Sequence, residues 1–267
     1  MRVLCLGDVF GKSGREAIFN DLPSIKKSKK IDLVIANVEN SAHGFGVTER
    51  IADKFLAESE INILTVGDHA ISRKDTPINN NLVVNAGNYH NGKFGEGYAI
   101  IEFQGKKVAV ISLLGIVFIE NEKKIISNPF EKFNEIYEKI KDKTDLIFLD
   151  FHAEATGEKQ AMGFHVDGKI TAMFGTHTHV PTADARIFPK GTGYITDAGM
   201  CGNYNSVIGA EPERALTHHL PNIKRTHLQP QNGDGSLSGV IFTIDDKTNK
   251  CIKAENLFVD FNKTLSQ

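Results

Sequence analysis

Short runs of apolar residues alternate with amphipathic segments along the first third of the chain. The apolar runs predict buried strands at residues 2–7, 32–38 and 62–66. The segments between them, 11–28 and 49–59, have helical spacing. Strands that are joined through helices by short connections pair in parallel. The pattern therefore predicts an α/β fold built around a parallel sheet.

The rest of the chain has a more mixed pattern. Residues 98–103 and 107–113 flank Gln104-Gly105-Lys106 and predict a hairpin. Helical spacing recurs at 129–142, 154–163 and 211–220. Further strands are expected at 145–151, 169–174, 186–188, 193–196, 239–244 and 251–261. Because the chain has no internal repeat, low-complexity segment or clear linker, we expect one domain over residues 1–267, with two mixed sheets in a sandwich flanked by helices.

Composition narrows the class of protein. The 267 residues are 40% hydrophobic, which suffices for one large core, and the net charge of −2 gives no sign of a nucleic-acid-coating surface. Three widely spaced cysteines predict neither a disulfide framework nor a zinc knuckle, and they favour a reducing, cytoplasmic setting. The first strand begins at once and no apolar run reaches membrane length, so we expect neither a signal peptide nor a membrane span.

Five predicted strands end at polar residues that can bind metal. In open α/β sheets the carboxyl ends of the strands border the ligand crevice. The candidate ligands are Asp8, Glu39, Asn40, Asp68, His152, His177 and His179. Carboxylate, amide and imidazole groups without thiolate suit Mn, Fe or Zn. Seven ligands are too many for one tetrahedral ion, so they indicate two ions that share a bridging carboxylate.

The last two candidates lie in the stretch from Phe174 to Pro181. Residues at positions i and i+2 of an extended segment point to the same side of the backbone, and Pro181 disfavours a helix there. We therefore expect an extended segment that presents His177 and His179 together. A His-x-His pair alone is weak evidence for a metal site; the other four strand ends strengthen it.

Two ions of this kind acidify a water between them, and the resulting hydroxide can attack phosphorus while the metals hold the phosphoryl oxygens. The leaving group then needs a proton. His69 lies next to a candidate ligand but is not needed to complete the coordination of two metals. It is therefore the candidate general acid.

Simpler interpretations exist for single residues. Asp8 could cap a helix, and Glu39 and Asn40 could belong to a turn. The stretch Gly7–Ser13 resembles a nucleotide-binding P-loop, but that motif requires glycine at position 6, where this chain has Leu6. The coincidence of polar residues at successive strand ends favours the metal centre.

The same residues resemble the calcineurin-like metallophosphoesterases, and more closely their bacterial YmdB-type branch. The matching motifs are Gly7-Asp8-Val9, Glu39-Asn40, Gly67-Asp68-His69, His152–Thr156, Gly175–Thr182, Thr196–Met200 and Tyr204–Gly209. The resemblance implies an α/β/β/α sandwich, a centre of two metals, usually iron or manganese, and hydrolysis of phosphodiesters such as 2',3'-cyclic nucleotides. Zinc or magnesium would also suit such a centre.

The resemblance also divides the ligands between the ions. It implies that Asp8, Glu39, Asn40 and His179 hold one ion, that Glu39, Asp68, His152 and His177 hold the other, and that His69 is catalytic. The family usually has Asn where this chain has Asp68. The alternatives left open are a phosphomonoesterase or a nuclease with the same centre, and a regulatory protein that binds metal or nucleotide without catalysis. A homo-oligomer is compatible with any of them.

Overall fold

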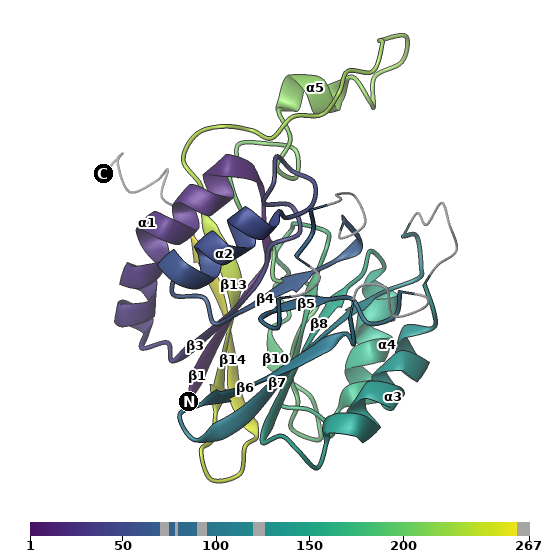
Figure 1. Ribbon diagram of the computed structural model, residues 1–267. Helices are drawn as coiled ribbons and strands as arrows, with labels where there is room; N and C mark the ends of the chain where they lie inside the picture. The colour runs from purple at the N-terminus through teal and green to yellow at the C-terminus, as the bar shows by residue number, and fades with distance from the viewer. Residues whose placement is uncertain (70–74, 78–79, 90–94, 120–125, 261–267) are drawn as a thin grey trace.

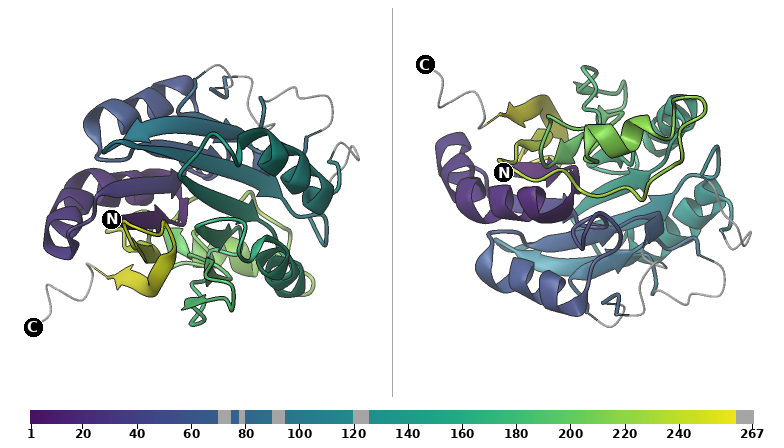
Figure 2. Two further views of the ribbon diagram at one scale, coloured as in Figure 1. Left: turned by 90° about the horizontal axis from the view of Figure 1, so that it is seen from below. Right: turned by 90° about the horizontal axis from the view of Figure 1, so that it is seen from above.

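The structure is a computed structural model that describes residues 1–69, 75–77, 80–89, 95–119 and 126–260. Two six-stranded sheets pack face to face, and helices cover both outer faces (Figure 1, Figure 2). This arrangement confirms the predicted α/β fold with two mixed sheets flanked by helices.

The first sheet consists mainly of the N-terminal third of the chain. Its strands β1, β3, β4 and β5 are parallel, whereas β13 runs antiparallel to β1 and β14 antiparallel to β13. In spatial order the strands are β14 (Cys251–Val259), β13 (Leu237–Ile244), β1 (Arg2–Leu6), β3 (Leu33–Asn37), β4 (Ile63–Val66) and β5 (Val83–Asn85).

The second sheet comes from the middle of the chain. Strands β11, β9, β8 and β7 are parallel, and β10 and β6 pair antiparallel at the two edges. In spatial order the strands are β10 (Arg186–Ile187), β11 (Gly193–Ile195), β9 (Ala172–Thr176), β8 (Leu146–His152), β7 (Lys106–Leu114) and β6 (Tyr98–Phe103). The β6–β7 pair is the hairpin that the sequence predicted. A separate short pair joins β2 (Asp8–Val9) to β12 (Met200–Cys201).

The apolar residues sort into three layers because strand side chains alternate between the two faces of a sheet. In β1, Val3 and Cys5 pack between the sheets, whereas Leu4 and Leu6 pack toward the helices. Helices α1 (Gly11–Lys29) and α2 (Glu49–Glu58) cover the first sheet, and α3 (Pro129–Ile140) and α4 (Thr156–Val166) cover the second. Helix α5 (Pro212–Leu216) lies on a segment that projects away from the sandwich (Figure 1).

Several boundaries differ from the sequence prediction. The helix expected at 211–220 is only the five residues of α5, and α4 begins at Thr156 rather than at Glu154. The short strands β2, β5 and β12 were not predicted, because two or three residues carry no detectable periodicity. The extended segment expected at His177 and His179 is wrong: both residues have positive φ, 102° and 65°, so the chain turns sharply there.

Within the part of the chain that the structure describes, none of the helices is long and apolar enough to cross a membrane. That all 267 residues form a single domain stays a prediction.

Candidate metal centre

All seven candidate ligands gather at one end of the sandwich. Three strands of the first sheet lead to the oxygen ligands, with Asp8 after β1, Glu39 and Asn40 after β3, and Asp68 after β4. The second sheet supplies the imidazoles, because His152 ends β8 while His177 and His179 follow β9. Carboxyl ends of parallel strands meet at one edge of a sheet. The packing of the two sheets therefore places the oxygen ligands opposite the imidazoles.

The first group of ligand atoms is compact. Glu39, Asp68, His152 and His177 each offer one ligand atom, and these atoms lie within 4.8 Å of one another. His152 Nε2 lies 3.1 Å from Glu39 Oε1 and 3.1 Å from Asp68 Oδ1. His177 Nδ1 lies 3.0 Å from the same His152 nitrogen.

Contacts on the far side of each histidine ring determine which ring nitrogen faces the group. The Thr176 hydroxyl donates to Asp150 Oδ1 at 2.6 Å and so accepts from His152 Nδ1 at 2.9 Å. His177 Nε2 lies 3.2 Å from Glu154 Oε2, at ion-pair distance. When both rings are neutral, a proton on His152 Nδ1 facing Thr176 and one on His177 Nε2 facing Glu154 leave the lone pairs of His152 Nε2 and His177 Nδ1 directed at the carboxylates. Acceptors that face acceptors at this distance require positive charge between them.

A second group of acceptors lies beside the first. Asn40 Nδ2 donates to Gly44 O at 3.1 Å, so Asn40 Oδ1 is the atom that lies 3.2 Å from His179 Nε2. His179 Nδ1 donates to Ile208 O at 2.8 Å, which leaves Nε2 as the lone pair. Asp8 Oδ1 lies 3.9 Å from His179 Nε2 and is buried without a hydrogen-bond partner among the described residues. Such an oxygen is the ligand that a cation would satisfy.

Electrostatics in this centre show the same need for positive charge. Burial raises the pKa of Asp8 to about 6, against the opposing effect of His179 and His152. Burial also favours the neutral form of Glu39, but His152 and His69 hold its pKa well below the usual value. Burial acts to lower the pKa of His152, yet Glu39 and Asp68 outweigh it and raise that pKa well above the ordinary value. The candidate ligands thus fit cations, because the carboxylates carry negative charge and the lone pairs point toward one place.

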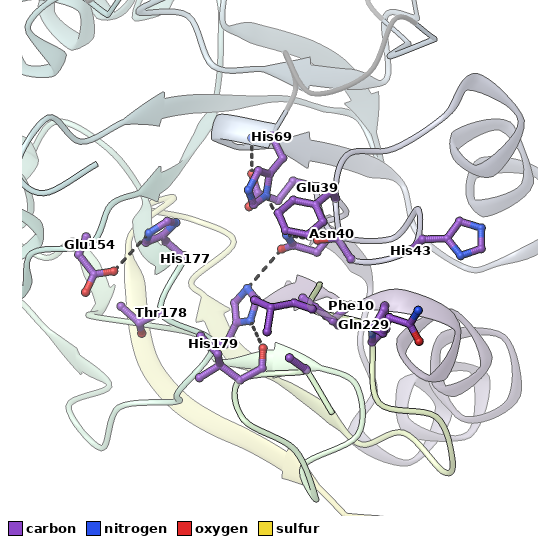
Figure 3. A pocket seen from close by; sticks show the side chains of 16 residues that line it. Phe10, Glu39, Asn40, His43, His69, Glu154, His177, Thr178, His179 and Gln229 are labelled. Atoms are coloured by element: carbon purple, nitrogen blue, oxygen red, sulfur yellow. Dashed lines mark hydrogen bonds and ion pairs between the residues drawn. The ribbon is translucent and has the colours of Figure 1, made fainter. Parts of the chain in front are cut away.

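His69 lies above the carboxylates and lines the adjoining pocket (Figure 3). Burial acts to lower its pKa, but Glu39 raises it to about 9. His69 Nδ1 lies 3.3 Å from Glu39 Oε1 and 2.9 Å from Asn40 Nδ2. These contacts are alternatives, because a charged ring donates to Glu39 whereas a neutral ring accepts from Asn40. The pKa of about 9 favours the charged ring, which is the form that can act as a general acid.

Glycines let the backbone approach the centre closely. A Cβ on Gly67 would lie 2.2 Å from Glu39 Oε2 and 2.5 Å from the His152 ring. Any larger residue than glycine at position 67 would therefore clash with Glu39 and His152.

A buried ion pair that the sequence did not reveal supports the turn between His177 and His179. Lys159 Nζ lies 2.6 Å from Asp197 Oδ2, and both side chains are fully buried. The same carboxylate oxygen accepts from the Thr178 amide at 3.1 Å and from its hydroxyl at 2.8 Å. Asp197 follows β11 just as the ligands follow their strands, a signal that could have identified it.

A cavity of about 300 Å³ opens beside the centre (Figure 3). Its polar side is lined by Glu39, Asn40, His69, Glu154, His177, Thr178 and His179. Its other side is mainly apolar and is lined by Phe10, Gly44, Phe45, Ile208, Ala210, Leu228 and Pro230, together with Gln229 and His43. The His43 ring points away from the other histidines (Figure 3).

Comparisons with known proteins agree with the fold and with the cluster of candidate metal ligands. A family model described as YmdB-like protein matches residues 4–257 of this chain. The chain belongs to the YmdB-like family. A relative from Bacillus subtilis (strain 168), named 2',3'-cyclic-nucleotide 2'-phosphodiesterase, is 40% identical over 97% of both chains.

Two further comparisons concern Mycoplasma pneumoniae. A relative from that organism, named putative phosphatase/phosphodiesterase, is 40% identical over 96% of this chain and 92% of its own. A crystal structure described as a novel phosphatase from that organism covers 100% of this chain and 96% of its own, with a TM-score of 0.86 and 38% identity. The family resemblance and the fold predicted from sequence are confirmed.

Proposed function

We propose that this YmdB-like protein is a metal-dependent phosphodiesterase that hydrolyses 2',3'-cyclic nucleotides. One observation carries the proposal: two adjoining groups of buried and half-buried acceptor atoms converge on one place. The name of the Bacillus subtilis relative supports the substrate class.

The ligand sets proposed are those that the family resemblance implied. Asp8, Glu39, Asn40 and His179 would hold one ion, and Glu39, Asp68, His152 and His177 the other, with Glu39 shared. We propose iron or manganese, because the donors are oxygen and nitrogen without thiolate. Divalent ions in these positions supply Lewis-acid polarisation of phosphoryl oxygens and acidify an attacking water.

The protein's own residues would orient the metal ligands and protonate the leaving group. In its charged form His69 donates its Nε2 proton to the departing ribose oxygen and keeps its Nδ1 proton, which faces Glu39 Oε1 at 3.3 Å. Glu154 and Thr176 keep His177 and His152 in the orientation that faces the carboxylates of Glu39 and Asp68. The cavity of about 300 Å³ has the size of a small-molecule site, which favours a mononucleotide over long nucleic acid.

The test is turnover of 2',3'-cAMP and of bis-p-nitrophenyl phosphate by manganese-loaded protein, with metal content measured on the same samples. We expect turnover in the parent and a loss of about 100-fold or more in His69→Ala with its metal retained. Turnover of a phosphomonoester but of neither diester would favour the phosphomonoesterase alternative. No turnover of any ester, nucleic acid included, by metal-loaded parent would favour the regulatory binding protein.

Two further expectations belong to the proposal. A cytoplasmic location and a homo-oligomeric state stay predictions, which cell fractionation and light scattering would check.

A further inference from the structure

We propose that the apolar half of the cavity is a subsite for the nucleobase of the substrate, with the Phe45 ring as its stacking surface. The inference rests on the proposed function and adds to it the part of the nucleotide that the metal centre does not touch.

The apolar wall begins where the polar centre ends. The Phe45 ring meets the His69 ring edge-on, with 4.9 Å between centroids, and the Phe10 ring meets His179 in the same way at 5.4 Å. A phosphodiester seated on the ligand side would therefore direct the rest of the molecule along these two phenyl rings. The length of one ribose separates the phosphate of a cyclic nucleotide from its base.

The two rings have different freedom. Phe10 is fixed between backbone segments, because a Cβ on Gly44 would lie 3.1 Å from its ring and a Cβ on Gly209 would lie 2.6 Å from it. Phe45 is 44% exposed and Ile208 is 56% exposed, although both are apolar and line the cavity. Exposed apolar side chains that line a concave site beside polar ligands are typical of a binding surface.

The chemistry of this half suits a flat aromatic group. The described residues that line it include no carboxylate, lysine or arginine, so a second phosphate gains no ion pair from them. Gln229 lies beside Phe10, at the end of the pocket away from His177 (Figure 3). Stacking tolerates any base because every base has a π-face. We therefore expect purine and pyrimidine nucleotides both to be accepted, with purines ahead.

The test compares two esters that differ only in the base. These are 2',3'-cAMP and the 2',3'-cyclic phosphate of 1-O-methylribose, assayed with manganese-loaded parent, Phe45→Ala and Phe164→Ala. Phe164 is a matched control, since it is an exposed phenylalanine on α4 that stacks on Phe188 and does not line the cavity. The quantity measured is the ratio of kcat/KM for the nucleotide to kcat/KM for the base-free ester.

We expect Phe45→Ala to lower this ratio by about 5- to 150-fold, the range of aromatic stacking on one base, and Phe164→Ala to leave it at the parent value. Damage transmitted from Phe45 to His69 affects both esters and cancels in the ratio. An unchanged ratio in Phe45→Ala that still turns over both esters would overturn the subsite.

A second readout does not depend on activity. Saturation-transfer NMR with adenosine and metal-free protein should show contacts to the adenine protons in the parent and in Phe164→Ala, and their loss in Phe45→Ala. Equal contacts in all three proteins would refute the proposal. Absence of turnover of both esters by the metal-loaded parent would instead overturn the proposed function, and the adenosine contacts would then decide the subsite alone.

Discussion

The buried pair of Lys159 and Asp197 allows a quantitative prediction. Lys159→Met keeps most of the side-chain volume but removes the charge that lies 2.6 Å from Asp197 Oδ2. Removing one partner of a buried ion pair costs about 3–5 kcal/mol, because the other charge stays buried and unpaired. The Asp197 carboxylate keeps hydrogen bonds from Thr178 and from the Gly199 amide, so we expect the lower end, about 3 kcal/mol.

The assay is urea unfolding followed by circular dichroism, with the metal concentration held fixed. Lys139→Met is the matched control, since it breaks an exposed pair with Glu96 and should cost less than about 1 kcal/mol. A second variant, Lys159→Met combined with Asp197→Asn, removes both charges while an amide oxygen can still accept from Thr178. We expect this double variant to be more stable than Lys159→Met alone.

Two results would refute this reasoning. Lys159→Met could prove as stable as Lys139→Met, or the double variant could prove no more stable than the single one. Either would mean that the pair is not electrostatically isolated from water. Because Thr178 separates His177 from His179, we also expect Lys159→Met to release bound metal faster than the parent does.

Three further predictions concern the centre itself. Asp68→Asn removes one carboxylate and makes the loaded site more positive, so the acidic limb of its pH–rate profile should move to lower pH; an unmoved limb would contradict this. Gly67→Ala should abolish metal retention measured by elemental analysis, whereas Gly157→Ala, whose Cβ would meet nothing within 4 Å, should retain metal like the parent. Glu154→Gln should weaken metal affinity about 10- to 100-fold in a chelator titration, because His177 loses the carboxylate that orients it; parental affinity would show that Glu154 is not needed.

The order of strands and helices could be predicted because apolar runs and helical spacing are local signals. The rule that ligands follow strand ends likewise identified residues as distant as Asp8 and His179, which the structure brings within 3.9 Å. The rule needs only the direction of each strand and the position of its last apolar residue.

Other features depend on contacts that no local pattern encodes. The backbone at His177 has positive φ, which residues other than glycine rarely adopt. The hydrogen bond from the Thr178 amide to Asp197 stabilises it here. Lys159 was predicted only as part of a helix, and its burial depends on a carboxylate 38 residues away. The roles of the individual ligands stay proposals.

The division of donors between the two sheets has a consequence for maturation. A chain in which only one half has folded presents either oxygens or imidazoles, so it holds at most a fragment of either coordination sphere. Cation capture then has to wait until the halves have docked, and each captured ion ties them together across the seam. Stripping the metals should accordingly loosen the join between the halves before it disturbs either half internally.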